Sequence, residues 1–167
     1  MVENTKILIS ACLLGRRVRY DGKTLAVSSQ ILQQWLKADR VVTICPEADA
    51  GMGVPRLPAE ITGGDGFDVL SGYANVVNEV GLDVTDKFIL GANLALSLCQ
   101  QHDISVAVLS ESSPSCGSTY LDAGNFDGEI ISGRGVLSQM FIDAGIEVFS
   151  HTNISDAAKY LSQHNIN

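Results

Sequence analysis

The chain has 167 residues, enough for one folded domain with a substantial core, and we expect a single α/β domain over residues 1–167. Hydrophobic residues make up 46% and charged residues 18% of the sequence, a balance that excludes an intrinsically disordered protein. The formal net charge of −8 disfavours duplex nucleic acid as the main partner, because a polyanion would be repelled on average.

Taken in chain order, the hydrophobic pattern predicts short buried strands that alternate with helices. Because continuous apolar strands between helices are typical of a parallel sheet, we expect a mostly parallel sheet covered on both faces. The predicted elements are a strand over 6–11, a helix over 28–38 capped by Ser28 or Ser29, a strand over 40–44, an irregular loop over 51–66, a short hairpin with strands at 69–70 and 74–77, a helix from Thr85 or Asp86 to about 101, a strand over 106–109, a loop over 110–119, a helix after 133–135 that ends near 144, a strand over 146–149 and a helix over 154–163.

The sequence contains no apolar run close to the ~20 residues of a membrane span, so we expect no membrane partner. The segment Ile9-Ser10-Ala11-Cys12 looks like a lipoprotein cleavage site, but the apolar stretch of ~7–15 residues that a signal peptide needs does not precede it. We therefore expect a cytoplasmic protein. Disulfides are rare in that reducing compartment, which leaves metal binding, catalysis or core packing as explanations for the cysteines.

Three of the four cysteines follow predicted strands. Cys12 comes directly after the first strand, Cys45 directly after the second, and Cys116 lies in the loop that begins after Leu109. In an open parallel sheet, ligands bind beyond the carboxyl ends of the strands, so these three side chains are predicted to meet in one crevice. Cys99 instead falls on the apolar face of a predicted helix and is interpreted as core filler.

Three thiolates suit either an iron–sulfur cluster or zinc. A zinc site would need a fourth ligand, for which His151 is the topologically plausible candidate. A cluster on three cysteines would keep one iron without a protein ligand, and an open position is what metal catalysis requires. Two polar neighbours fit such a site: Glu47 as a general acid or base, and the hydroxyl of Ser113. Each also has a plain alternative, a solvated loop carboxylate and a turn-capping serine.

The stretch Gly133-Arg134-Gly135 precedes a predicted helix and has two readings. It could bind an anion or a carbonyl through backbone N–H groups, or it could form a simple tight turn. The sequence alone does not decide between ligand binding and a simple turn.

The assembled motifs resemble the family of small bacterial proteins that includes 2-thiouracil desulfurase, also known as YbbK-like proteins. The resemblance runs from about Lys6 to Phe149. The motifs that carry it are Ser10-Ala11-Cys12-Leu13-Leu14-Gly15, Tyr20-Asp21-Gly22, Cys45-Pro46-Glu47, Pro55-Arg56, Pro58-Ala59-Glu60, Gly91-Ala92 and Ser113-Pro114-Ser115-Cys116-Gly117.

This resemblance implies a Rossmann-like three-layer α/β fold and a [4Fe-4S] cluster on Cys12, Cys45 and Cys116. It implies a desulfurase that removes sulfur hydrolytically from a small thionated base or nucleoside such as 2-thiouracil. The open iron would polarise the C–S bond as a Lewis acid, with Glu47 managing protons and Ser113 stabilising the intermediate. Two alternatives are an iron–sulfur enzyme that transfers sulfur, and a non-catalytic sensor module that binds zinc or an iron–sulfur cluster.

The sequence departs from the family pattern at two positions. Family members often carry a second cysteine just before Arg-Tyr-Asp-Gly, where this chain has Val18. Many also carry a lysine shortly before Ser-Pro-Ser-Cys, where this chain has Ser110. Both positions are expected near the pocket and bear on the identity of the substrate.

Overall fold

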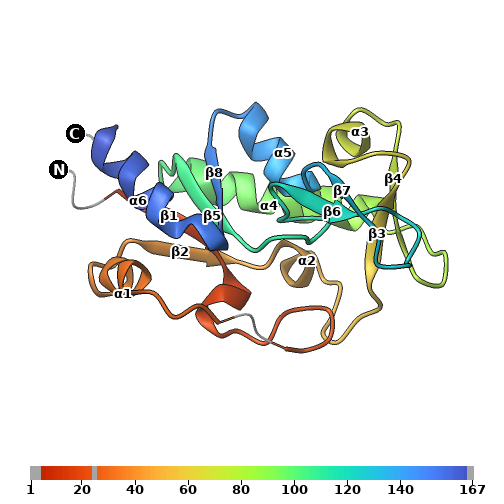
Figure 1. The fold of residues 1–167 in the computed structure, drawn as a ribbon, viewed down its shortest axis with the longest axis horizontal. Coiled ribbons are helices and arrows are strands. Elements are labelled where there is room, and N and C mark those ends of the chain that lie inside the picture. The colour runs from red at the N-terminus through yellow and green to blue at the C-terminus, as the bar shows by residue number, and fades with distance from the viewer. Residues whose placement is uncertain (1–4, 24–25, 165–167) are drawn as a thin grey trace.

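The structure is a computed structural model that describes residues 5–23 and 26–164. Its centre is a sheet of four parallel strands, β1 (Ile7–Ser10), β2 (Val41–Ile44), β5 (Val106–Leu109) and β8 (Glu147–Ser150), in the order β2-β1-β5-β8 (Figure 1). The chain moves outward from β1 to β2 and then returns to the other side of β1. The order of strands therefore reverses between β1 and β5, and their carboxyl ends mark the expected ligand site.

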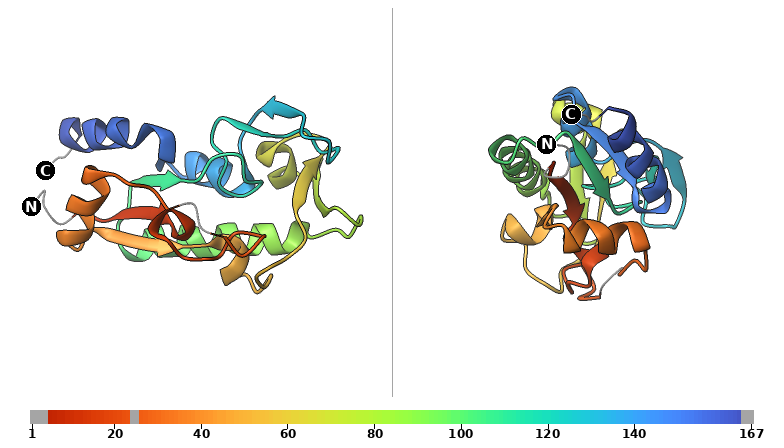
Figure 2. Two further views of the ribbon diagram at one scale, coloured as in Figure 1. Left: turned by 60° about the horizontal axis from the view of Figure 1, so that its bottom comes forward. Right: turned by 90° about the vertical axis from the view of Figure 1, so that its left-hand side faces the viewer.

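Helices cover both faces of this sheet and make the three-layer α/β fold that the sequence predicted. Because side chains alternate along a strand, Ile7 and Ile9 face one layer while Leu8 faces the other. Helices α1 (Gln30–Lys37) and α6 (Ile154–Gln163) pack on the first face, and α4 (Thr85–Gln101) and α5 (Val136–Asp143) pack on the second (Figure 2). Each large side chain fully buried in these layers contributes about 1.5–3 kcal/mol.

Beyond the carboxyl ends of the sheet, the chain forms a second group of short elements. Strand β3 (Ala59–Thr62) pairs antiparallel with β4 (Asn75–Asn78), and β6 (Tyr120–Asp122) pairs antiparallel with β7 (Ile130–Ser132). These four strands and helix α3 (Gly66–Leu70) lie together at one end of the molecule, past the end of the sheet that carries the cysteine loops (Figure 1).

The prediction of a hairpin with strands at 69–70 and 74–77 was wrong. Residues 66–70 form α3, because the Asp65 side chain accepts the backbone N–H of Phe67 and Asp68 while Asp68 reaches back to the N–H of Asp65. Strand β4 consequently pairs with β3, which lies inside the segment predicted as an irregular loop. The hairpin of β6 and β7 was also missed, since three-residue strands give too short a pattern to detect.

The remaining helices agree with the prediction except at their ends. Ser29 caps α1 by accepting the N–H of Leu32, whereas α4 has Val84 at its N-cap and the Thr85 hydroxyl instead accepts the N–H of Val76. The sequence indicated a turn over 12–15, where the structure has η2 (Ala11–Leu14), but it did not indicate the single turns α2 (Pro46–Asp49) and η3 (His151–Asn153). Within the described residues, no helix is both long and apolar enough to cross a membrane.

Candidate active site

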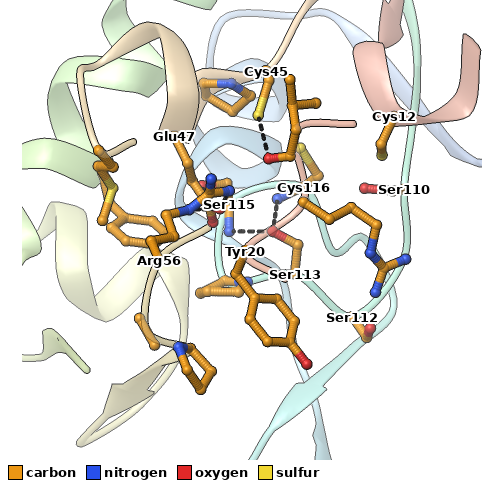
Figure 3. Close-up of a pocket in the computed structure, with 18 of the residues that line it drawn as sticks. Cys12, Tyr20, Cys45, Glu47, Arg56, Ser110, Ser112, Ser113, Ser115 and Cys116 are labelled. Atoms are coloured by element: carbon orange, nitrogen blue, oxygen red, sulfur yellow. Dashed lines mark hydrogen bonds and ion pairs between the residues drawn. The ribbon is translucent and has the colours of Figure 1, made fainter. Parts of the chain in front are cut away.

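A cavity of about 360 Å³ lies at the carboxyl ends of β1, β2 and β5. Its walls include Cys12, Cys45 and Cys116, whose sulfur atoms face the same space (Figure 3). Glu47 and Ser113, the two polar residues singled out in the sequence, also line it. The cavity therefore brings together all five residues that the sequence placed in a site.

Each of the three cysteines is held by a turn that follows its strand. Cys12 lies in η2 directly after β1, Cys45 is the N-cap residue of α2 directly after β2, and Cys116 lies in the loop after β5. Cys12 and Cys116 are buried, and Cys45 is partly buried. Cys99 lies elsewhere, on the core side of α4, where burial raises the pKa of its thiol to about 12. The interpretation of Cys99 as core filler agrees with that position.

The turn that carries Cys116 is fixed by hydrogen bonds from two directions. The Ser113 hydroxyl accepts the backbone N–H groups of Ser115 and Cys116 at 3.1 and 3.3 Å, so Ser113 does cap its turn. From the other side, the first N–H groups of α5 donate to carbonyls of residues 114 and 115. The helix start after Gly133–Gly135 thus binds carbonyl groups of its own chain.

Gly135 is the residue that permits this close approach of α5 to the cysteine turn. A Cβ atom at this position would lie 2.4 Å from the carbonyl oxygen of Ser115 and 2.7 Å from that of Pro114. The Ser138 hydroxyl, fully buried in α5, also donates to the carbonyl of Cys116 at 2.9 Å. Helix α5 therefore acts as a rigid support for the turn.

Burial dominates the electrostatics of the three thiols. It raises the pKa of Cys12, although a hydrogen bond with Ser110 and the charge of Arg19 oppose the shift. It also raises the pKa of Cys45, and it raises that of Cys116 well above the usual range. Negative charge on Cys12 or Cys45, which line the same cavity, raises the pKa of Cys116 further.

Beside the cysteines, Glu47 forms a buried ion pair with Arg56 (Figure 3). Their side chains are only 14% and 7% exposed, and both Nε and Nη2 of Arg56 donate to Oε2 of Glu47. The other carboxylate oxygen, Oε1, accepts a hydrogen bond of 3.4 Å from the hydroxyl of Ser115. Arg56 and Ser115 therefore fix the position of the Glu47 carboxylate, and Arg56 compensates its charge. This excludes the alternative of a solvated loop carboxylate.

The donor set of the cavity has the chemistry of an iron–sulfur site. Three cysteines on three separate turns supply the soft thiolate ligands that such clusters use. Among the described residues, no three His, Cys, Asp or Glu side chains lie close enough to share a single metal ion. His151, the fourth ligand that a zinc site would need, does not line the cavity and instead accepts the backbone N–H of Glu111 at 3.2 Å. This geometry gives the zinc alternative no support.

The chain is similar to proteins of one known family. The sequence model of the 2-thiouracil desulfurase family matches residues 7–153. The chain belongs to this family. An uncharacterized protein of Bacillus subtilis (strain 168), YbbK, is 39% identical over 150 residues, which cover 90% of this chain and 98% of YbbK. The solved structure of the [4Fe-4S]-dependent thiouracil desulfidase TudS is 41% identical, has a TM-score of 0.88, and covers 95% of this chain and 99% of its own.

The two departures from the pattern of the 2-thiouracil desulfurase family both lie in the cavity wall. The backbone carbonyl of Val18 accepts a hydrogen bond from the Cys45 thiol at 3.7 Å, while its side chain is buried. The Ser110 hydroxyl hydrogen-bonds with the Cys12 thiol, and the backbone N–H of Ser110 donates to the hydroxyl of the buried Ser10 at 3.1 Å. Positions 18 and 110 therefore shape the immediate surroundings of the cysteines.

The sequence did not single out two side chains that order this site. Ser115, 1% exposed, was quoted only as part of a motif, yet it is the hydroxyl that contacts Glu47. Glu111 was not considered, although its carboxylate accepts the N–H and hydroxyl groups of both Ser118 and Thr119. In the sequence, Glu111 is a charged residue two positions after a buried strand, and this position becomes informative when the loop is known to fold back on it.

Proposed function

We propose that this chain is an enzyme that removes sulfur hydrolytically from a thiolated pyrimidine such as 2-thiouracil. A [4Fe-4S] cluster bound by Cys12, Cys45 and Cys116 serves as its cofactor. The observation that carries the proposal is the convergence of these thiols with the Glu47–Arg56 pair in one cavity. Membership of the 2-thiouracil desulfurase family and the likeness to a [4Fe-4S]-dependent thiouracil desulfidase support it.

The proposed reaction exchanges one atom of the substrate and involves no net oxidation or reduction. Water adds to the thiocarbonyl carbon, the C–S bond breaks, and the carbon becomes a carbonyl. The products are uracil and hydrogen sulfide. One water supplies the new oxygen of uracil and the two protons of hydrogen sulfide, which leaves as hydrosulfide and a proton. When bound, the cluster supplies an iron without a protein ligand, whose Lewis acidity polarises the C–S bond.

Glu47 is assigned as the general base for the attacking water. Its Oε2 accepts hydrogen bonds from two donors of Arg56, whereas Oε1 accepts, among the residues described, a single long hydrogen bond from Ser115. Oε1 is therefore the oxygen positioned to accept the proton of the water, and Arg56 compensates the buried charge. The same carboxyl then returns the proton to the departing sulfur.

Ser113 is assigned to stabilise charge that develops on the substrate. The Ser113 oxygen accepts hydrogen bonds from two backbone N–H groups. The hydroxyl hydrogen of Ser113 can then donate a hydrogen bond to the substrate. A donor fixed by the turn needs little reorganisation during the reaction, which is the property of an effective oxyanion-type donor.

The first test is the iron and acid-labile sulfide content after anaerobic reconstitution. The wild type and Cys99→Ala, the matched control, should each hold about four irons and four sulfides per chain, and single alanine variants of Cys12, Cys45 and Cys116 should lose them. The wild type should then convert 2-thiouracil to equal amounts of uracil and hydrosulfide. Glu47→Gln should keep its iron but lose turnover by roughly 100-fold or more.

Other outcomes point elsewhere. Uracil formed without hydrosulfide in solution would indicate transfer of sulfur to an acceptor. Full iron content with no turnover of any thiolated pyrimidine would favour a sensor. Zinc without sulfide, or iron binding that does not depend on the three cysteines, would reject the cluster assignment.

A further inference from the structure

The connection between β6 and β7 places an exposed aromatic ring at the wall of the same cavity. Phe126 lines the cavity and is 37% exposed, and it belongs to neither of the two hydrophobic cores. Its backbone has a φ of +54°, a left-handed conformation that is uncommon for a bulky residue. Packing in the folded protein therefore does not explain either the exposed ring or the strained backbone.

A buried carboxylate holds this strained residue in place. Glu60, at strand β3, is 9% exposed, and its Oε1 accepts the backbone N–H of Gly124 at 2.9 Å and that of Phe126 at 3.2 Å. Hydrogen bonds to a charged acceptor are stronger than those between neutral groups, so they can compensate backbone strain. Two bonds to one oxygen fix the chain on both sides of residue 125.

The connection is also pressed against β3 without a gap. Gly124 has a φ of +95°, and a Cβ atom there would lie 2.6 Å from the carbonyl oxygen of Ile61. The N–H of Ala123 closes the turn by donating to the carbonyl of Glu129 at 2.7 Å. The ring of Phe126 therefore projects from an anchored turn, and strain kept at an anchored position is characteristic of functional sites.

We propose that Phe126 is a substrate-binding residue whose ring stacks on the heterocycle of the substrate, and that Glu60 is the positioning residue that holds it. The inference rests on the proposed function, because the same cavity contains the three cysteines. An aromatic face can stack on any planar base whatever its substituents. The ring of Phe126 therefore binds the pyrimidine ring, while the cysteine end of the cavity faces the sulfur atom. The volume of about 360 Å³ is sufficient for such a ligand.

The test compares KM and kcat for 2-thiouracil with inhibition by uracil, which shares the ring but has no sulfur to remove. Phe126→Ala should raise KM and the uracil inhibition constant together by about tenfold, with kcat changed by less than about twofold. Phe126→Tyr, which keeps the aromatic face, should restore both constants to within about threefold of the wild type, whereas Phe126→Leu should not.

Glu60 is tested in the same assay. Glu60→Ala should reproduce the rise in KM without loss of iron, and Glu60→Gln should have a smaller effect, because its amide oxygen can still accept both N–H groups. Tyr73→Ala is the matched control, since Tyr73 is an aromatic residue that is 82% exposed and lies outside the cavity wall. It should change neither constant.

Unchanged KM and uracil inhibition in Phe126→Ala would overturn the proposal, as would an equal effect of Tyr73→Ala or a loss of iron that accounts for the change. If a wild type with full iron content leaves 2-thiouracil intact, the proposed function fails separately. Calorimetric titration of that protein with uracil would still decide the stacking role: binding weakened by Phe126→Ala supports it, and binding that is absent or indifferent to the ring rejects it.

Discussion

At the scale of single residues, the Glu47–Arg56 pair shows how strongly the cavity depends on compensated charge. Both side chains are almost fully enclosed, so solvent compensates little of the charge that a lost partner would leave behind. A buried charge whose partner is removed destabilises a protein by about 3–5 kcal/mol, whereas an exposed pair contributes about 0–1 kcal/mol. The pair therefore matters for folding as well as for the proposed proton transfer.

Arg56→Ala should lower the free energy of unfolding by about 3 kcal/mol and reduce kcat by more than tenfold. Adding Glu47→Gln to it should restore part of the stability but none of the activity, because the double variant no longer buries an unpaired charge. Urea denaturation and steady-state kinetics measure the two effects. Lys6→Ala is the control, since it breaks an ion pair whose partner Asp39 is 96% exposed. Stability losses that simply add in the double variant would show that the two side chains are not coupled.

At the scale of elements, the loop between β5 and β6 is ordered around the carboxylate of Glu111. Burial by itself would raise the pKa of Glu111, but hydrogen bonds from Thr119 and Ser118 outweigh burial and lower it to about 2. The loop carries Ser113 and Cys116, so its order sets the position of both. An ionised carboxylate that accepts hydrogen bonds from five donors of the loop is thus the centre of this segment.

Glu111→Gln should lower the free energy of unfolding by about 2 kcal/mol at pH 7. Since the folded pKa of about 2 lies below the unfolded value of about 4.3, the contribution is complete above pH 5 and disappears as the pH falls toward 2. Urea denaturation of cluster-free wild type and variant at pH 7, 5, 4 and 3 measures this convergence. Glu147→Gln, an exposed carboxylate on β8, should change stability by less than about 0.5 kcal/mol. A difference that stays constant with pH would refute the role of the charge.

At the scale of the whole molecule, the proposed cluster joins three separate turns that follow β1, β2 and β5. A ligand that binds only the folded chain stabilises it by mass action, and here it would cross-link both halves of the sequence. The melting temperature of the reconstituted protein should exceed that of the cluster-free protein by about 5 °C or more.

Differential scanning calorimetry of both forms under anaerobic conditions measures this difference. Cys12→Ala should abolish it. Cys99→Ala should lower both melting temperatures by removing a core side chain, yet leave the difference between them intact. Equal melting temperatures with and without iron in the wild type would argue against a cluster that bridges the three turns.

The hydrophobic pattern of the sequence was sufficient to predict the main elements and the loops expected to form the site. The four sheet strands and the helices α1, α4, α5 and α6 were predictable because each is a continuous apolar run or has a clear helical period. The predicted strands alone led to the expectation that Cys12, Cys45 and Cys116 converge, because the carboxyl ends of parallel strands share one edge of the sheet.

How the second group of elements closes the cavity became evident from the folded chain and not from its sequence. The pairing of β3 with β4, the burial of Glu60 and Glu111, and the partners of Glu47 all depend on contacts between segments far apart in the chain. A charged residue in a sequence pattern reads as solvated surface, and its burial becomes evident only when the donors that compensate it are brought beside it. Hydrophobic periodicity is a local property, whereas the satisfaction of a buried polar group is not, and this difference separates what was predictable here from what was not.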